Sequence, residues 1–230
     1  MTLQEILDSV MLECGMATET AYSTNSRDEV LRLVNLANRS ARRIATDWKW
    51  QKMRKVYTFS LTTATSYDLP SDFREMVADT VFSNSVVSPV DLPTNPSEWR
   101  YLQTNGTGVG PTYKMRFIGG RIEVFDPQDG ETVSFEYHSD HPVLATDGTT
   151  TKARFTLDSD TFRLDDDLLT MDIIWRYKKL LGLPDWQIDL AETTAYANTV
   201  KGQDAGAKTF YPGEIETTGE PYTPLWVNNA

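Results

Sequence analysis

The feature that most constrains the fold is a helical pattern running from Asp165 to Gly202. Apolar residues recur in its first half at steps of three and four, the spacing of an amphipathic helix: Leu169, Ile173, Ile174, Tyr177, Leu180 and Leu181. Acids open the pattern at 165–167 and bases crowd its far end at 176–179, which suits the helix dipole at both ends. The run is interrupted at Gly182-Leu183-Pro184. We therefore expect two helices, or one sharply bent helix, whose apolar face is covered by the rest of the chain.

Two more helices are predicted near the N-terminus. The first follows the capping-box sequence at residues 2–5 and stops at Gly15. Residues 16–25 are small and polar and read as a linker. A second capping-box sequence at residues 26–29 starts a longer helix, with two apolar sets that predict packing on two sides: Val30, Val34, Ala37, Ala41, Ile44 and Trp48, then Leu31, Leu33 and Leu36.

After Trp50 the apolar period changes from 3.6 to 2. Residues 56–61 and 66–70 read as a hairpin, and residues 113–118 and 121–125 as a second hairpin through Gly119-Gly120. A turn at 126–130 then leads to a strand at 131–137, which completes a predicted β-meander. Between the hairpins, 83–110 is expected to be a long surface excursion with a short helix at 96–102.

The predicted fold class is therefore α+β, a helical bundle with an inserted antiparallel β-meander domain and an extended C-terminal arm. The expected units are the N-terminal helices at 1–50, the β-rich domain at 51–162, the C-terminal helix pair at 163–202 and the arm at 203–230. The arm has no periodicity and three prolines, yet it carries apolar groups that need a docking surface: Phe210, Tyr211, Tyr222, Leu225 and Trp226.

The charge of the chain is uneven. The net charge is −11, but residues 26–55 hold nine bases against three acids, so this segment is +6 and the remainder is −17. Such an asymmetry indicates two surfaces with different partners, although a solvated helix face with a few ion pairs to the acidic body would also explain it. Arg39, Arg42 and Arg43 share one helical face and can meet an acidic neighbour together. The acidic balance does not suit a nucleic-acid readout module.

The composition also indicates the cellular compartment in which the protein is expected. A single cysteine, Cys14, allows no intrachain disulfide, the N-terminus carries acids where a secretion signal carries bases, and no apolar run is long enough for a membrane span. We expect a protein that stays in a reducing, soluble compartment.

Four motifs could suggest chemistry, and each has a simpler explanation. The glycine-rich run 106–110 lacks a following Lys-Ser/Thr and a helix. His138 and His141 lie at a strand exit and read as a polar turn without a third ligand. Asp158, Asp160 and Asp165 lack the calcium-loop pattern and fit helix capping better. Cys14 ends an apolar stripe and reads as a buried small residue. We expect no catalysis, no cofactor and no metal.

The order of these parts resembles the head-to-tail adaptor, or head-completion, proteins of short-tailed bacteriophages. The resemblance covers roughly residues 3–200 and lies in the motifs LVNLANRSARRIATDWKW, SYDLPSDF, RIEVFDPQDGETVSFEY and LLTMDIIWRYKKLLGLPDW. It implies a structural virion protein at the head-tail interface, assembled in the host cytoplasm, without catalytic residues. It further implies a ring of twelve copies beneath the portal protein, which extends the channel for double-stranded DNA without binding it specifically and receives tail or nozzle proteins. The C-terminal segment commonly reaches the portal in that family.

A binding domain is the alternative that the sequence leaves open. Trp99, Tyr101 and Tyr113 could line a cleft and stack on a carbohydrate. A glycosidase with paired acids is more remote, because no pair of carboxylates stands out.

Overall fold

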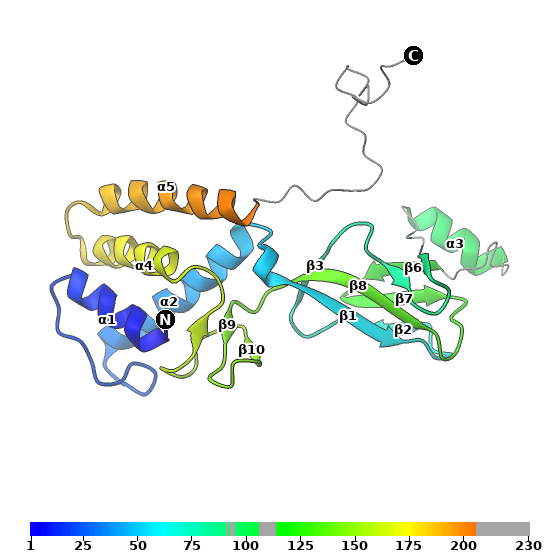
Figure 1. The fold of residues 1–230 in the computed structure, drawn as a ribbon, viewed down its shortest axis with the longest axis horizontal. Coiled ribbons are helices and arrows are strands. Elements are labelled where there is room, and N and C mark those ends of the chain that lie inside the picture. The colour runs from blue at the N-terminus through cyan, green and yellow to red at the C-terminus, as the bar shows by residue number, and fades with distance from the viewer. Residues whose placement is uncertain (91, 93–94, 106–113, 206–230) are drawn as a thin grey trace, which may run out of the picture.

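The computed structural model describes residues 1–90, 92, 95–105 and 114–205. The protein is α+β and elongated, with most of its helices and one small sheet at one end and the two larger antiparallel sheets and a further helix at the other (Figure 1). Its helices are α1 (Leu3–Glu13), α2 (Asp28–Asp47), α3 (Pro96–Asn105), α4 (Asp166–Leu181) and α5 (Trp186–Asp204), with a 3-10 turn at Gln51–Met53. Within the described ranges, no helix is both long and apolar enough to cross a membrane.

The strands form three antiparallel sheets. Strands β1 (Arg54–Ser60), β8 (Thr132–Ser139), β4 (Phe82–Ser83) and β5 (Ser88–Pro89) lie in that order, and β3 (Phe73–Met76) also pairs with β8. The second sheet has the order β2 (Ser66–Asp68), β7 (Arg121–Phe125), β6 (Lys114–Ile118). A small third sheet has the order β10 (Thr151–Lys152), β9 (Val143–Leu144), β11 (Thr161–Phe162).

The first predicted capping box forms, and the second does not. The box at Thr2 forms as predicted, since the Glu5 N–H donates to Thr2 Oγ1 at 3.3 Å and the Thr2 N–H donates to the Glu5 carboxylate at 2.8 Å. The second predicted box is wrong, because α2 begins after Arg27, which makes no side-chain cap bond. There the Asn25 side chain accepts the Arg27 N–H at 3.0 Å and turns the chain before the helix starts.

The break between the last two helices is confirmed. Gly182 ends α4 in the left-handed conformation at φ 67°, which glycine adopts without strain. Asp165 caps the start of α4, accepting the Leu168 N–H at 2.8 Å. Pro184 lies in the connection, and α5 starts two residues later at Trp186.

The helical core is built from α1, α2 and α4 together with the small sheet. One face of α2 is buried through Val30, Leu33, Ala37, Ala41 and Ile44. The prediction of packing on two sides is wrong in part, because Leu31 and Trp48 are exposed by 42% and 39%. The predicted stripe of α4 also ends early, with Leu180 and Leu181 exposed.

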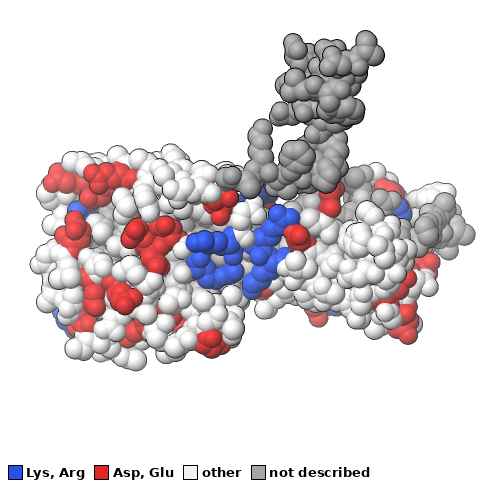
Figure 2. Space-filling view, viewed as in Figure 1, with Lys and Arg blue, Asp and Glu red and all other residues white. Residues whose placement is uncertain are grey.

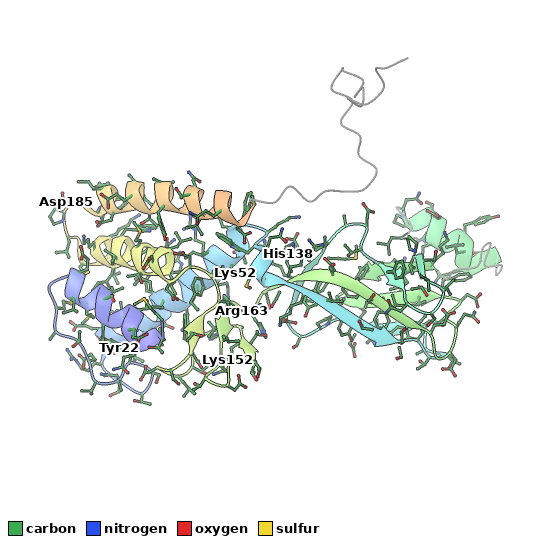
Figure 3. The ribbon with its side chains drawn as sticks, viewed as in Figure 1. Tyr22, Lys52, His138, Lys152, Arg163 and Asp185 are labelled. Carbon is green, nitrogen blue, oxygen red and sulfur yellow. The ribbon has the colours of Figure 1, made fainter. Side chains whose placement is uncertain are left out.

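The segment between α1 and α2 is more than a linker. Tyr22 is fully buried in the helical core, and its phenol donates to Asp8 Oδ1 at 2.6 Å. Its backbone N–H and that of Ser23 donate to Asp158, at 3.2 and 2.8 Å. Tyr22 therefore fastens this segment to α1 and to the loop between β10 and β11 (Figure 3).

The second core lies between the two larger sheets. Phe117 on β6 meets Phe135 on β8 with ring centroids 5.4 Å apart, and Phe59 on β1 meets Tyr67 on β2 at 5.2 Å. Residues from both sheets are buried together, among them Met115, Ile122, Val124, Val133 and Phe135. The two sheets therefore pack face to face.

This packing overturns the predicted strand pairing. The expected hairpin of 56–61 with 66–70 does not form, because β1 pairs with β8 and β2 pairs with β7 in the other sheet. The expected meander is also wrong, because β7 does not pair with β8. Only the β6–β7 hairpin forms as predicted, with Gly119 and Gly120 at φ 58° and 75°. The short loops at 61–65 and 126–131 carry the chain between layers rather than between neighbouring strands.

The helix expected in the excursion 83–110 is present as α3. Its Asn95 side chain accepts the Glu98 N–H at 2.8 Å, and Pro96 occupies the first turn, where no backbone N–H is needed.

Candidate assembly surfaces

The arginines of α2 form the first candidate surface. Arg39, Arg42 and Arg43 are all exposed on this helix. Among the described residues none of the three has an acidic side chain within ion-pairing distance, although Arg43 lines a cavity that also contains Asp47 and Asp172. We call these three residues the α2 arginine face.

Other bases of the segment 26–55 do have intramolecular partners. Arg27 pairs with Glu19, Arg54 with Glu136, Lys49 with Glu75 at 3.3 Å, and Lys55 with Asp72 at 2.6 Å. Ion pairs to the acidic body therefore account for part of the basic excess, as the simpler explanation expected. They leave the α2 arginine face unexplained.

A cavity of about 230 Å³ lies beside Arg43, between α2, α4 and α5. Its floor contains Asp172, which is only 8% exposed. The Trp175 indole donates to Asp172 Oδ1 at 2.9 Å, and Arg176 Nε donates to Asp172 Oδ2 at 2.7 Å. The guanidinium of Arg176 also stacks over the Trp175 ring at 4.3 Å. Because the buried carboxylate is fully paired, this cavity is a preformed hollow between helices without a reactive group.

The burial of Asp172 was not predicted from the sequence. Asp172 follows Leu168 and Leu169 and lies on the apolar side of α4, where an acid reads as an irregularity. Its spacing to Arg176 is the one available signal, since residues four apart on a helix can pair.

The junction between the helices and the large sheets is tied from several elements. We call residues 48–53 the joint, because they connect α2 to β1. Arg74 on β3 donates to the carbonyls of Ala45 and Thr46, at 2.9 and 2.6 Å, and so caps the C-terminus of α2 with a positive charge. Asp204, at the end of α5, accepts the Gln51 N–H at 3.0 Å.

Arg163 links the joint to the segment that follows β8. It donates to the Lys52 carbonyl at 3.0 Å and to the His141 carbonyl at 2.9 Å (Figure 3). Figure 2 shows Lys and Arg side chains gathered on this face, where the helices meet the sheets, while acidic side chains occupy much of the surface toward the end of the helical part.

A buried carboxylate completes the junction. Asp72 is 6% exposed and accepts Lys55 Nζ at 2.6 Å, the Tyr137 phenol at 2.8 Å and the Ser139 hydroxyl at 2.7 Å. Burial favours the neutral acid, but the bonds from Lys55, Ser139 and Tyr137 outweigh it and hold the pKa of Asp72 at about 2. Burial and the bond to Asp72 raise the pKa of Tyr137. Asp72 stays charged near neutral pH and joins β1, β3 and β8 rather than serving as an acid or base.

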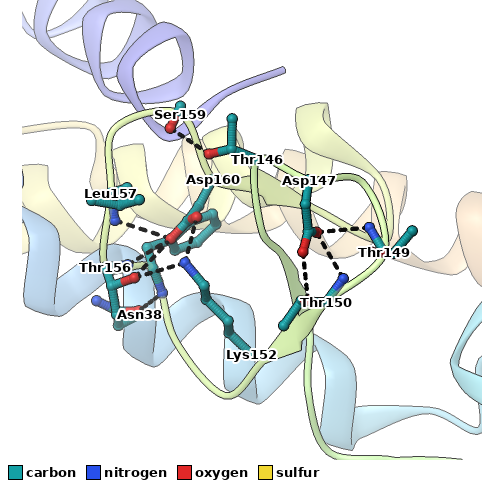
Figure 4. A network of polar contacts seen from close by, with 11 residues as sticks. Asn38, Thr146, Asp147, Thr149, Thr150, Lys152, Thr156, Leu157, Ser159 and Asp160 are labelled. Atoms are coloured by element: carbon teal, nitrogen blue, oxygen red, sulfur yellow. Dashed lines mark hydrogen bonds and ion pairs between the residues drawn. The ribbon is translucent and has the colours of Figure 1, made fainter.

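The three loop acids are explained without a metal, but not all by capping. Asp165 caps α4 as expected. Asp160 instead is fully buried in its own loop and accepts the Thr156 N–H at 2.8 Å, the Leu157 N–H at 3.0 Å and Lys152 Nζ at 2.8 Å (Figure 4). Burial opposes its charge, yet Lys152 and the backbone donors lower its pKa. The Asp158 side chain holds the Tyr22 segment, so neither of these two carboxylates caps a helix. Their backbone carbonyls do serve a helix start, since Asp160 and Asp158 accept the Leu3 and Gln4 N–H groups of α1 at 2.8 and 3.1 Å.

The remaining motifs are placed as follows. His138 lies within β8 and is 6% exposed, so the polar-turn interpretation fits only His141, whose Nδ1 lies 3.1 Å from the Thr151 carbonyl. Burial lowers the pKa of His138. Cys14 is half-buried rather than buried, and desolvation raises its pKa. In the described ranges no three His, Cys, Asp or Glu residues gather as a metal site, and the glycine-rich run 106–110 lies outside those ranges.

The described residues do not bring the aromatic side chains of the carbohydrate alternative together. Trp99 is 3% exposed, with its ring between Phe125 and the Arg116 guanidinium, which lies 4.5 Å from the ring centroid. Tyr101 is 67% exposed on the same helix, and Tyr113 lies outside the described residues. Trp99 lines a cavity of about 590 Å³ together with Phe125, but so little of its ring is exposed that its main role is to pack α3 on β7.

The expected arm residues Phe210, Tyr211, Tyr222, Leu225 and Trp226 also lie outside the described residues.

A family model described as SU10 adaptor protein matches residues 1–212. A search of curated proteins found no significant match.

Proposed function

Because the chain belongs to the SU10 adaptor protein family, a family of bacteriophage head-to-tail adaptors, we propose that it forms a ring under the portal protein. The ring extends the DNA channel and offers the attachment site for tail proteins. The family match over residues 1–212 carries this proposal, and it places the protein at the head-tail interface of the virion as a structural component.

The charge distribution supports a channel role. A lumen for DNA must not hold phosphates, and the chain outside residues 26–55 carries −17. We propose twelve copies, the number that the resemblance implies for a ring on the portal, and genome passage without specific DNA contacts.

The α2 arginine face is the proposed lateral or axial contact of each subunit. Its three guanidinium groups are exposed and have no acidic partner among the described residues, so they can meet an acidic surface of a neighbour. We propose the segment after residue 202 as a docking arm that reaches the portal or an adjacent subunit through Phe210, Tyr211, Tyr222, Leu225 and Trp226.

We also propose that the chain is organised as predicted, with helical segments 1–50 and 163–202 and a β-rich unit at 51–162. The existence of two separate hydrophobic cores supports this division. The small sheet complicates it, because Val143, Phe155 and Phe162 pack into the helical core.

Native mass spectrometry and electron microscopy with purified portal protein test the function. We expect the isolated chain to be a folded monomer that assembles into a ring only on the portal. A stable ring of the isolated chain would contradict the dependence on the portal, and a chain that never associates with the portal would overturn the adaptor role.

A further inference from the structure

Strand β1 is a long sheet edge that the described part of the chain leaves open. All seven residues, Arg54–Ser60, pair with β8 in unbroken register, and no other described strand lies on the opposite side. The other end of this sheet is β5, which has two residues and contains Pro89. An open edge of this length normally carries a proline, a bulge or an inward charge that prevents pairing with another chain.

Strand β1 lacks these protections. It contains no proline, and its register with β8 has no irregularity. Its two charges are engaged elsewhere, Arg54 with Glu136 and Lys55 with Asp72. Val56 is 66% exposed, and Thr58 and Ser60 are exposed on the same face.

The hydrogen bonding of the sheet shows which backbone groups are free. Just beyond β1, the Leu61 N–H donates to the Glu131 carbonyl at 2.7 Å. Alternate residues of an antiparallel strand direct their backbone groups to the same side. Residues 57 and 59 therefore face β8, while Val56, Thr58 and Ser60 direct their N–H and C=O groups to the open edge, where no described residue bonds to them.

We propose that residues 222–227 of a second copy of this chain add a strand to the open edge of β1. This inference rests on the proposed function, since the second copy is the neighbouring subunit of the ring. Added strands gain affinity from backbone bonds and selectivity from alternate side chains.

The segment Tyr222-Thr223-Pro224-Leu225-Trp226-Val227 suits this role. It is rich in aromatic and β-branched residues, and its six residues are one fewer than the seven of β1. Its single proline fits if the N–H groups of Thr223, Leu225 and Val227 face β1, because Pro224 then points to the new outer edge. A proline there would also stop a further strand from adding.

The length and charge of the segment between α5 and residue 222 favour docking on a neighbouring copy. Asp204 bonds to Gln51, three residues before β1 begins, so a segment docking on its own β1 would need only a short loop, roughly two to six residues. Residues 206–221 lie between, enough to span about 50 Å when extended. That connection carries Glu214, Glu216 and Glu220 against one base, Lys208. The bases over the joint complement it (Figure 2).

Amide hydrogen exchange of the full chain, alone and bound to portal protein, tests the inference. We expect the Val56, Thr58 and Ser60 amides to exchange freely in the isolated chain and at least about tenfold more slowly in the portal-bound ring. Thr58→Pro removes the outward N–H without breaking the β8 ladder and should abolish the protection of Val56 and Ser60. Thr58→Val keeps the backbone donor and should retain it.

A second pair of variants on the arm leaves the folded body untouched. Leu225→Pro should abolish the protection of all three amides, and Pro224→Ala should retain it. If the ring forms while these amides still exchange freely, the strand addition is wrong and the adaptor function stands. Protection already present in the isolated chain would show docking within one copy and overturn the second-copy assignment. Failure of the wild-type chain to assemble on portal would remove the proposed function and this inference with it.

Discussion

Asp72 illustrates how a single buried charge can join separate strands. Its carboxylate is paired with Lys55 and accepts two hydroxyl groups, so its cost of desolvation is offset by three directed bonds. These partners come from β1 and β8, far from Asp72 in the chain. The pairing is therefore a property of the folded junction, and it has a defined pH dependence.

We expect Asp72→Asn to lower the free energy of unfolding by about 2 kcal/mol at pH 7. The folded pKa of about 2 lies below the ordinary value of 3.8, so the charged form contributes stability above pH 4. That contribution is lost as the pH falls toward 2, and the difference between variant and wild type should narrow over this window. Chemical denaturation at several pH values measures it. The control is Asp68→Asn, whose side chain is 84% exposed and pairs with Arg121 at the surface, and which should change little. A variant difference that stays constant from pH 7 to pH 2 would contradict this assignment.

The α2 arginine face is expected to affect assembly and not stability, in contrast to Asp72. Changing Arg39, Arg42 and Arg43 together to Glu should prevent assembly on portal protein and leave the melting temperature nearly unchanged, because exposed charges without partners contribute little to folding. Thermal unfolding and native mass spectrometry measure the two effects. The matched control is Arg27→Glu, which removes the pair with Glu19 and should affect the body rather than the assembly. A large loss of stability in the triple variant would show that these residues pair within the subunit.

At the scale of elements, the start and end of α4 fix where the chain turns back into α5. α4 begins at a capping aspartate and ends at a glycine in the left-handed conformation. α5 then returns antiparallel over α4, held by the pair of Lys178 with Asp189 at 3.0 Å (Figure 1). The turn at 182–185 therefore sets the position of α5 against the cavity beside Arg43.

We expect Gly182→Ala to destabilise the protein by about 1 kcal/mol, since a side chain at φ 67° is strained even in open space. Gly202→Ala is the matched control. Gly202 lies in α5 with a helical backbone and free space around it, so alanine should be neutral or stabilising by about 0.5–1 kcal/mol. Equilibrium unfolding of both variants compares them. Equal effects at the two sites would mean that the conformation of Gly182 is not the reason.

At the scale of the whole molecule, two hydrophobic cores are held in one elongated body by the joint. Arg74, Arg163 and Asp204 reach the joint from β3, from the loop after β11 and from α5. Long-range polar bonds to backbone groups fix the orientation of two elements more firmly than surface ion pairs, because both partners are geometrically confined. Subunits of a ring need such a fixed shape.

Deleting the residues after Gly206 should leave the circular dichroism and the cooperative unfolding of the body unchanged and abolish attachment to portal protein. Two hydrophobic cores are already complete within the described residues 1–205, which is the reason to expect an intact body. Normal attachment of the shortened chain, or its failure to fold, would show that the segment is not a docking arm.

The sequence by itself determined most of the elements and their ends. The helices, the break at Gly182 and the β6–β7 hairpin with its two glycines follow from interactions between residues a few positions apart, which a linear pattern records. The errors at short range were small, such as the start of α2 at Asp28 instead of Arg27. The exposed α2 arginine face was also readable, because helical periodicity places all three side chains.

Only the tertiary structure decided which strands pair and which polar groups are buried. Residues 56–61 and 66–70 alternate as a hairpin would, but Tyr57 and Phe59 of β1 pack against Phe135 of β8, and β2 pairs with β7 in the other sheet. Strand patterns record which face is apolar and not which neighbour lies beside it. The burial of Tyr22, the Asp72 network and the open edge of β1 likewise depend on contacts between residues far apart in the chain, and such contacts leave no local period.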